Sequence, residues 1–325
     1  MSHTDIWHRY QSFHSTETVQ RCLEKIYKNK RIEAPQEKAY QNGYSFIYYL
    51  KHAENFFIQG KNAPLAIQPL LYFYGLTQLL KACLLTVDPD YPASSSVLAH
   101  GVTSRKRKKQ HYCFFEDEVK IQRNGLYDHV SVILFGQKQQ GMEKYTMNQL
   151  LSRIPELADS YLFHREERPL TKVTVEANKL YLTEPMAAQY HMSIGRLQEF
   201  LQYNINHKQT TDLPGTVLLS KSNINPFFSD FLMYNSTEKQ YYLPSDRENC
   251  IHLPELLTHY LLLYNLSMIT RYETEWWYDL LLTHSNDSYV FISKFLDISY
   301  RKIPAYCLEY LLQAPACNGE DQVEF

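Results

Sequence analysis

The sequence predicts a predominantly helical α+β protein of 325 residues, with a helical bundle core built from both chain ends and a mixed α/β insertion in the middle. Two observations favour this class. Long apolar runs with the helical period occupy both ends, whereas short β-branched and aromatic runs separated by turn signals occupy the middle. No internal repeat or low-complexity linker interrupts the chain. We therefore expect a single compact unit over residues 1–325.

The N-terminal part, residues 1–97, is expected to be helical. A Ser/Thr-rich cap opens a periodic segment at Ser15–Arg31, and residues 34–58 continue the pattern. After the break at Asn62-Ala63-Pro64, the segment PLAIQPLLYFYGLTQLLKACLLTVDP is apolar on nearly all sides. A helix of that kind is normally buried by neighbours on every face, so we expect it at the centre of the bundle.

The middle part, residues 98–245, changes character. Aromatic and β-branched runs flank the turn signals Asn124-Gly125 and Ala177-Asn178, and helical patterns are interleaved with them. The predicted strands are His111–Gln122, Val130–Phe135, Lys172–Glu176, Lys179–Leu182, Thr216–Ser220 and Lys239–Leu243, and the predicted helices are Thr146–Ile154 and His191–Tyr203.

The C-terminal part, residues 246–312, turns helical again from Leu253 onward. The closing residues 313–325 are acidic and lack an apolar period, so we expect a frayed tail. These helices are expected to complete the bundle that the N-terminal part begins.

Composition excludes several function classes. Six cysteines include no CxxC pair, which argues against zinc ribbons and thioredoxin-like chemistry. The 10 glycines form neither GxGxxG nor a P-loop, and HExxH and GxSxG are absent. We therefore predict no cofactor and no metal site. The N-terminus lacks a signal-peptide core, and Leu65–Val87 is interrupted by polar residues, so we expect no membrane span and a cytoplasmic location.

Charge is concentrated in one short run. The formal net charge is −2, and residues 105–109 (RKRKK) carry five positive charges, so the rest of the chain sums to −7. A single basic run on an otherwise acidic chain favours a local contact with an anion over general coating of nucleic acid.

Three segments resemble the bacterial YaaC-like family: KACLLTVDPDYP (81–92), LAHGVTSRKRKKQHYCFFEDEVKIQRNGL (98–126) and LSMITRYETEWWYDL (266–280). The resemblance spans most of the chain and implies little about mechanism. The helical part is more weakly similar to HEPN domains, which are helical bundles. Many HEPN members are metal-independent ribonucleases that use an Arg-x(4–6)-His pair.

Arg105 and His111 fit that ribonuclease spacing, with the histidine as acid and base and the arginine stabilising charge on phosphorus. The same spacing recurs at Arg9–His14, Arg123–His129 and Arg247–His252, so it carries little weight. The pair would also enter a strand-like stretch, whereas in nuclease members it lies on a bundle helix. The sequence leaves open whether the protein is an enzyme.

The basic run itself could be a solvated loop, which is the usual role of adjacent cations. Its neighbours also suit an anion site, because Thr103 and Ser104 add hydroxyl groups and Tyr112, Phe114 and Phe115 could form a stacking surface for a base. The predicted ligand-binding residues in the run are Arg105, Lys106, Arg107, Lys108 and Lys109.

Three further residues complete the predicted site. Lys81 places an ammonium group on an otherwise apolar helix, where it must reach solvent or find a partner. His100 precedes Gly101 in a turn-rich segment, although a lone histidine is more often a structural hydrogen-bonding residue. Arg271 could bind an anion beside a tryptophan face or could simply pair with Glu275 one helical turn away.

Three functions remain open. The first is a module that binds a phosphate-bearing ligand, nucleotide or RNA, through residues 105–109 with Lys81, His100 and Arg271 nearby. The second is a metal-independent ribonuclease. The third is a scaffold whose 27 tyrosines form an interface, with a nucleotide-metabolism enzyme as partner because family genes often neighbour purine-biosynthesis genes. The sequence makes no prediction of oligomeric state.

Overall fold

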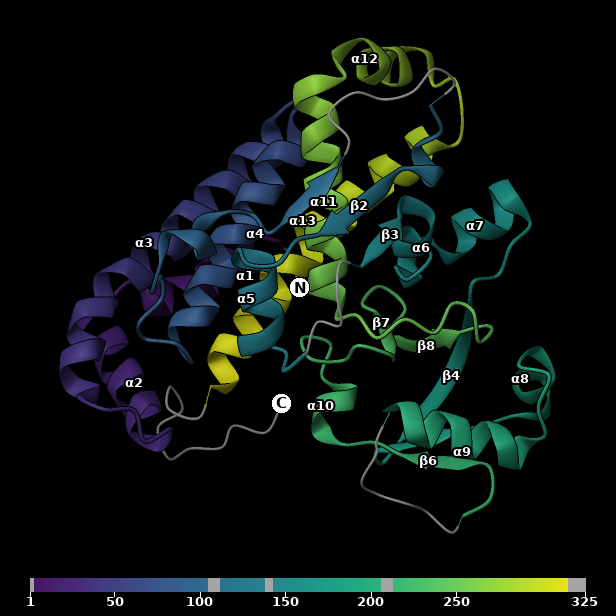
Figure 1. Ribbon diagram of the computed structural model, residues 1–325, viewed down its shortest axis with the longest axis horizontal. Coiled ribbons are helices and arrows are strands. Elements are labelled where there is room, and N and C mark those ends of the chain that lie inside the picture. The colour runs from purple at the N-terminus through teal and green to yellow at the C-terminus, as the bar shows by residue number, and fades with distance from the viewer. Residues whose placement is uncertain (1–2, 105–111, 138–142, 206–212, 315–325) are drawn as a thin grey trace.

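The computed structural model describes residues 3–104, 112–137, 143–205 and 213–314. Helices from both chain ends pack into one body, as predicted, and the middle of the chain adds two small antiparallel sheets (Figure 1). The α+β, predominantly helical class is therefore confirmed. The bundle helices are α1 His3–Tyr10, α2 Thr16–Asn29, α3 Pro35–Asn62, α4 Gln68–Leu85, α11 Glu255–Tyr272, α12 Thr274–Thr283 and α13 Ser288–Gln313.

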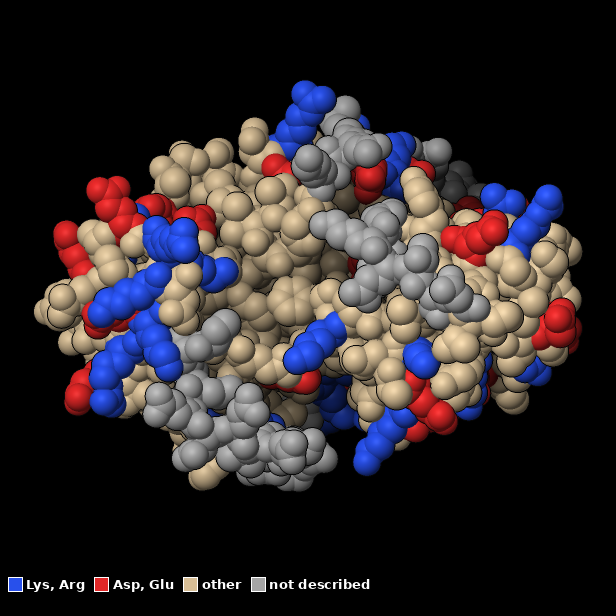
Figure 2. All heavy atoms as spheres, turned by 90° about the horizontal axis from the view of Figure 1, so that it is seen from below, with Lys and Arg blue, Asp and Glu red and all other residues tan. Residues whose placement is uncertain are grey.

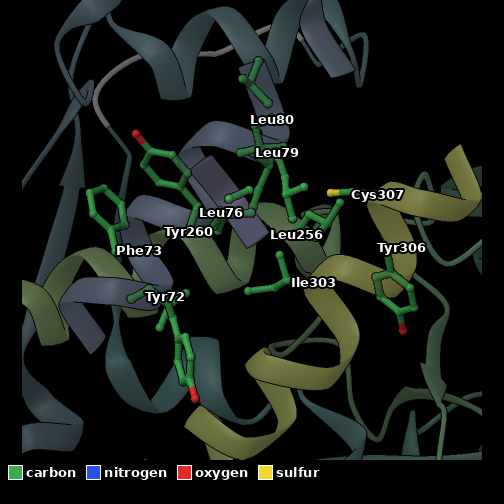
Figure 3. Close-up of a cluster of buried hydrophobic side chains, with 14 of the residues drawn as sticks. Tyr72, Phe73, Leu76, Leu79, Leu80, Leu256, Tyr260, Ile303, Tyr306 and Cys307 are labelled. Carbon is green, nitrogen blue, oxygen red and sulfur yellow. The ribbon is translucent and has the colours of Figure 1, made fainter. Parts of the chain in front are cut away.

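The centre of the bundle is α4, which lies against α3, α11 and α13. Its apolar sequence is explained by this position, because neighbours cover it on almost every side. Figure 3 shows side chains from α4, α11 and α13 meeting in this core, among them Leu76, Leu256 and Ile303. All three side chains are 0% exposed.

The first sheet has the strand order β1-β2-β3 and shares the core of the bundle. In the register of the first pair, Val102 lies opposite Ile121, and both side chains are buried. The strands are β1 Val102–Ser104, β2 Glu118–Ile121 and β3 Lys144–Thr146, and the helices near them are α5 Leu126–Ile133, α6 Met147–Leu151 and α7 Ala158–Arg165.

The second sheet has the order β6-β5-β4-β8-β7 and a separate hydrophobic cluster with two helices. The predicted hairpin across Ala177-Asn178 is confirmed, and both turn residues have positive φ. The strands are β4 Leu170–Glu176, β5 Lys179–Tyr181, β6 Thr216–Leu218, β7 Met233–Asn235 and β8 Gln240–Pro244, and the helices are α8 Glu184–Gln189, α9 Ile194–Ile205 and α10 Lys221–Ile224.

In the described part of the predicted strand His111–Gln122, only Glu118–Ile121 is a strand, and it follows a 3₁₀ turn at Phe114–Glu116. A second predicted strand is wrong. Val130–Phe135 belongs largely to α5, because Gly125 caps a helix there. Leu126, Val130 and Leu134 recur every four residues and point into the core, which is the helical rather than the strand period. The β-branched content of the segment was a weaker signal than this spacing.

A buried ionic network connects the second sheet to the bundle. The Lys302 ammonium of α13 lies 2.5 Å from Glu255 Oε1 of α11 and 3.0 Å from Glu156 Oε2. It also donates a hydrogen bond to the backbone carbonyl of Tyr234 in β7, at 2.8 Å. Lys302 is 2% exposed, so these acceptors replace the water that its charge would otherwise need.

No helix in the described residues is long and apolar enough to cross a membrane.

Candidate functional site

Two glycine turns hold the His100 backbone in place. The backbone N–H of Gln122 donates to Gly101 O at 2.9 Å, and the N–H of Leu126 donates to Ala99 O at 2.7 Å. Gly101 and Gly125 both have positive φ, and a Cβ on Gly125 would lie 2.4 Å from Gly101 Cα. Only two residues without side chains can approach so closely. The short loop around His100 is therefore fixed against the Gly125 turn.

Two core residues bind the backbone carbonyl of His100 through hydrogen bonds. It accepts hydrogen bonds from the hydroxyl of Tyr260 at 2.8 Å and from the backbone N–H of Tyr127 at 3.2 Å. Tyr260 is fully buried on α11, so its hydroxyl needs such an acceptor. This bond ties the loop to the central helices, which Figure 3 shows with Tyr260 close to Phe73.

The His100 ring lies among aromatic side chains from two helices. Its centroid is 4.9 Å from that of Phe73 and 6.2 Å from that of Tyr74, both on α4, and 5.9 Å from that of Tyr264 on α11. Neither ring nitrogen has a hydrogen-bond partner among the described residues, and neither is sealed from solvent. The ring is thus held by packing while its polar atoms stay free for a ligand.

Lys81 extends from α4 on the same side of the bundle. Its ammonium lies 5.7 Å from the ring centroid of Tyr49 on α3, and it forms no ion pair with a described carboxylate. Burial lowers the pKa of Lys81. Lys81 was expected to find a partner or to reach solvent. It is half-buried, and its ammonium lies over the aromatic ring of Tyr49.

Arg271 occupies the last turn of α11. Its Nε donates to Ser267 O at 3.1 Å, and its guanidinium lies 5.4 Å from the Tyr272 ring. It forms no ion pair with Glu275, although both residues are described, because α11 ends at Tyr272 and the chain bends before α12. The simple i,i+4 explanation for Arg271 is therefore wrong.

Lys81 and Arg271 interact electrostatically with His100, and we use the name His100 pocket for these three residues. The pKa of His100 is lowered first by burial, then by the positive charge of Arg271 and then by that of Lys81. No described carboxylate offsets these effects. Lys81 and Arg271 thus act electrostatically on His100, and the hypothesis that they share one cleft with Arg105 stays a prediction, because residue 105 lies outside the described residues.

Two further predicted residues, Thr103 and Ser104, are described on β1. Thr103 is exposed on β1 and accepts a hydrogen bond from Gln122 Nε2 at 3.1 Å, while the hydroxyl oxygen of Ser104 is sealed from solvent. Residues 105–109 and His111 lie outside the described residues, so the basic run and the Arg105–His111 pair stay predictions.

The proposed stacking surface after the basic run is wrong. Phe114 and Phe115 are 1% and 4% exposed, so their rings belong to the core and cannot bind a base. Tyr112 is partly buried, and its ring meets the edge of Trp276 at a centroid distance of 4.7 Å. Exposed aromatic side chains lie instead on α3, at Tyr40, Tyr44 and Tyr48, which were not among the predicted site residues.

A second polar cluster lies in the core of the bundle. The side chains of Ser299, His259 and Glu255 are arranged as a hydrogen-bonded relay, with Ser299 Oγ 2.8 Å from His259 Nδ1. All three are buried in the core, so no substrate reaches the serine. No group of three or more potential metal ligands occurs among the described residues.

A further basic region lies on the surface of the bundle. Lys and Arg side chains gather at the left end of the face in Figure 2, where Figure 1 places α2. Acidic residues are mixed with them, and Lys28 pairs with Glu24 at 2.5 Å. This mixed pattern is typical of a solvated helix face rather than of an anion site.

The structure is that of a predominantly helical α+β protein in which His100 lies among aromatic rings and is affected by two cationic side chains. The chain belongs to the family of YaaC-like proteins, whose model matches residues 11–311. The resemblance of the three sequence segments is thereby confirmed. Comparisons with curated proteins and with solved structures returned no match.

Proposed function

We propose that the His100 pocket binds a phosphate-bearing ligand. The observation that carries this proposal is an imidazole with open ring nitrogens whose pKa is lowered by burial and by the charges of Arg271 and Lys81, with no described carboxylate among the causes. Lys81 and His100 are half-buried, whereas Arg271 is exposed. Burial disfavours the charged form of Lys81, and burial together with the charges of Arg271 and Lys81 disfavours the charged form of His100. A bound anion removes that cost and provides acceptors for all three groups.

The rest of the pocket suits the same ligand class. Aromatic rings on two sides limit access of water, which strengthens the attraction between the cations and a phosphate. The basic run begins directly after β1, which follows His100, so Arg105–Lys109 is proposed to add further cations to the ligand. We place this binding role in the cytoplasm, as the sequence predicts.

Replacing Lys81 with methionine is expected to weaken binding of ribose 5-phosphate and of inorganic phosphate about tenfold or more. The variant keeps the aliphatic packing over Tyr49 and removes one charge-assisted hydrogen bond to the anion. Isothermal titration calorimetry of the purified protein measures the change. Arg271→Met is expected to behave in the same way.

Lys172→Met is the matched control. Lys172 is an exposed lysine on β4 of the second sheet, paired with Glu238, and it lies in a different hydrophobic unit from the pocket. Its removal should leave the dissociation constant unchanged within about twofold. Equal binding by the wild type and Lys81→Met, or no binding of either phosphate compound by the wild type, would contradict the proposal.

A further inference from the structure

An open groove between α3 and α4 is lined by Tyr49, whose ring centroid lies 5.7 Å from the Lys81 ammonium. It has a volume of about 360 Å³. The room it offers is that of a small ligand such as one nucleoside. Its lining residues are Tyr48, Tyr49, Lys51, His52 and Asn55 of α3 and Gln78 of α4.

Groove and pocket share one face of α4. Tyr74, Gln78 and Lys81 are spaced four and three residues apart, so they lie on the same side of the helix. All three are half-buried. Tyr74 contacts the His100 ring, Lys81 acts on the pKa of His100, and Gln78 between them lines the groove. A ligand whose phosphate binds in the His100 pocket would therefore pass over Gln78 to place its other end in the groove.

Aromatic rings build the α3 side of the groove. Tyr49 lies beneath the ammonium of Lys81, and His52 packs on Phe56 at a centroid distance of 4.5 Å. Phe56 in turn stacks on Tyr74 at 5.7 Å. Tyr48 is 63% exposed, so the face of its ring is open to a partner. Packed and open rings along one wall are suited to stacking with a flat heterocycle.

Polar side chains in the groove can form hydrogen bonds with the edge of such a heterocycle. The side-chain amides of Gln78 and Asn55 have no hydrogen-bond partner among the described residues. An amide offers both a donor and an acceptor, which matches the alternating groups on the edge of a nucleobase. A sugar phosphate alone would leave these rings and amides unused.

We propose that the groove is the base subsite of a mononucleotide site, with the phosphate in the His100 pocket. This inference rests on the proposed function and adds the ligand class. The volume of the groove favours a single nucleotide over an RNA strand, which would need a series of stacking positions.

Calorimetric titration with the 5′-monophosphates of adenosine, guanosine, cytidine and uridine tests the proposal, with ribose 5-phosphate as reference. At least one nucleotide is expected to bind about tenfold or more tightly than ribose 5-phosphate. In Gln78→Ala and Tyr48→Ala that preference should fall to about threefold or less, while the affinity for ribose 5-phosphate stays unchanged. Circular dichroism confirms that the variants are folded.

Tyr40→Ala is the control for removal of an exposed tyrosine. Tyr40 lies two turns before Tyr48 on α3, is 66% exposed and does not line the groove, so its loss should not change either affinity. Equal affinity of the wild type for all four nucleotides and for ribose 5-phosphate would overturn the base subsite and leave phosphate binding intact. No binding of any phosphate compound would overturn both. A single-stranded tetranucleotide that binds more than about tenfold tighter than every mononucleotide would overturn the single-nucleotide site in favour of RNA.

Discussion

Gly125→Ala is expected to lower the free energy of unfolding by about 2–5 kcal/mol and to abolish measurable phosphate binding. The added Cβ would lie 2.4 Å from Gly101 Cα and 2.5 Å from Gly101 N, and these backbone atoms cannot move without displacing the adjacent His100. Gly125 also has φ +109° and ψ 175°, a conformation almost restricted to glycine. Urea denaturation and calorimetry with ribose 5-phosphate measure the two effects.

Gly136→Ala separates the steric clash from backbone strain. Gly136 also has a positive φ, at +64°, but no atom of the described residues lies within 4 Å of the position of an added Cβ. We expect this variant to cost about 1–2 kcal/mol and to bind phosphate normally. If Gly125→Ala is no less stable than Gly136→Ala and binds phosphate like the wild type, the contact between the two glycine turns does not position His100.

Lys302→Met is expected to lower the free energy of unfolding by about 3–5 kcal/mol. The substitution leaves the buried carboxylates of Glu156 and Glu255 without their cation, close to each other's charge. Burial alone would raise the pKa of Glu255, but Lys302 and His259 outweigh it and hold that pKa below its usual value. Without Lys302, burial raises the pKa of Glu255. The expected loss of stability therefore includes the free energy of protonating a carboxyl group that is ionised in the wild type.

Arg301→Met is the neighbouring control for this prediction. Arg301 lies on the same helix and pairs with Asp297, but both side chains are nearly half exposed. Loss of such a surface pair should cost no more than about 1 kcal/mol. Urea denaturation at pH 7 gives both values. Equal costs for the two variants would contradict the structural role assigned to the buried network.

The main elements of the fold could be predicted because their signals are local. The apolar period of α4 and the hairpin across Ala177-Asn178 follow from spacing and turn residues within short windows. The helix α5 was missed because β-branched content outweighed the four-residue spacing of its buried side chains. The strand β7 was missed because three residues carry too little pattern.

The pocket could be predicted only in part. Lys81 stood out because it interrupts an apolar helix, Arg271 because two tryptophans follow it closely in the sequence, and His100 because a glycine follows it. That Lys81 and Arg271 act on His100 depends on how α4 and α11 pack, which no local pattern encodes. The groove on α3 was missed for the same reason. Tyr48 and His52 form its wall only together with Gln78, which belongs to another helix.

Two hypotheses from the sequence stay predictions. The metal-independent ribonuclease depends on Arg105 and His111, which lie outside the described residues. The scaffold role depends on exposed tyrosines, and several do lie along α3, among them Tyr40, Tyr44 and Tyr48. Our proposal assigns Tyr48 to a ligand instead, and the base-preference titration separates the two uses of that residue.

The most direct test of the His100 pocket is the pKa of His100 itself, with and without phosphate. Burial and the charges of Arg271 and Lys81 should hold this pKa below the usual histidine value of about 6.5 in the free protein. A bound phosphate favours the imidazolium form and should raise the pKa. Nuclear magnetic resonance follows the imidazole C–H signal against pH, and a His100→Gln variant assigns it. A clear rise at saturating phosphate is the predicted result, and an unchanged pKa under those conditions would show that the anion binds elsewhere.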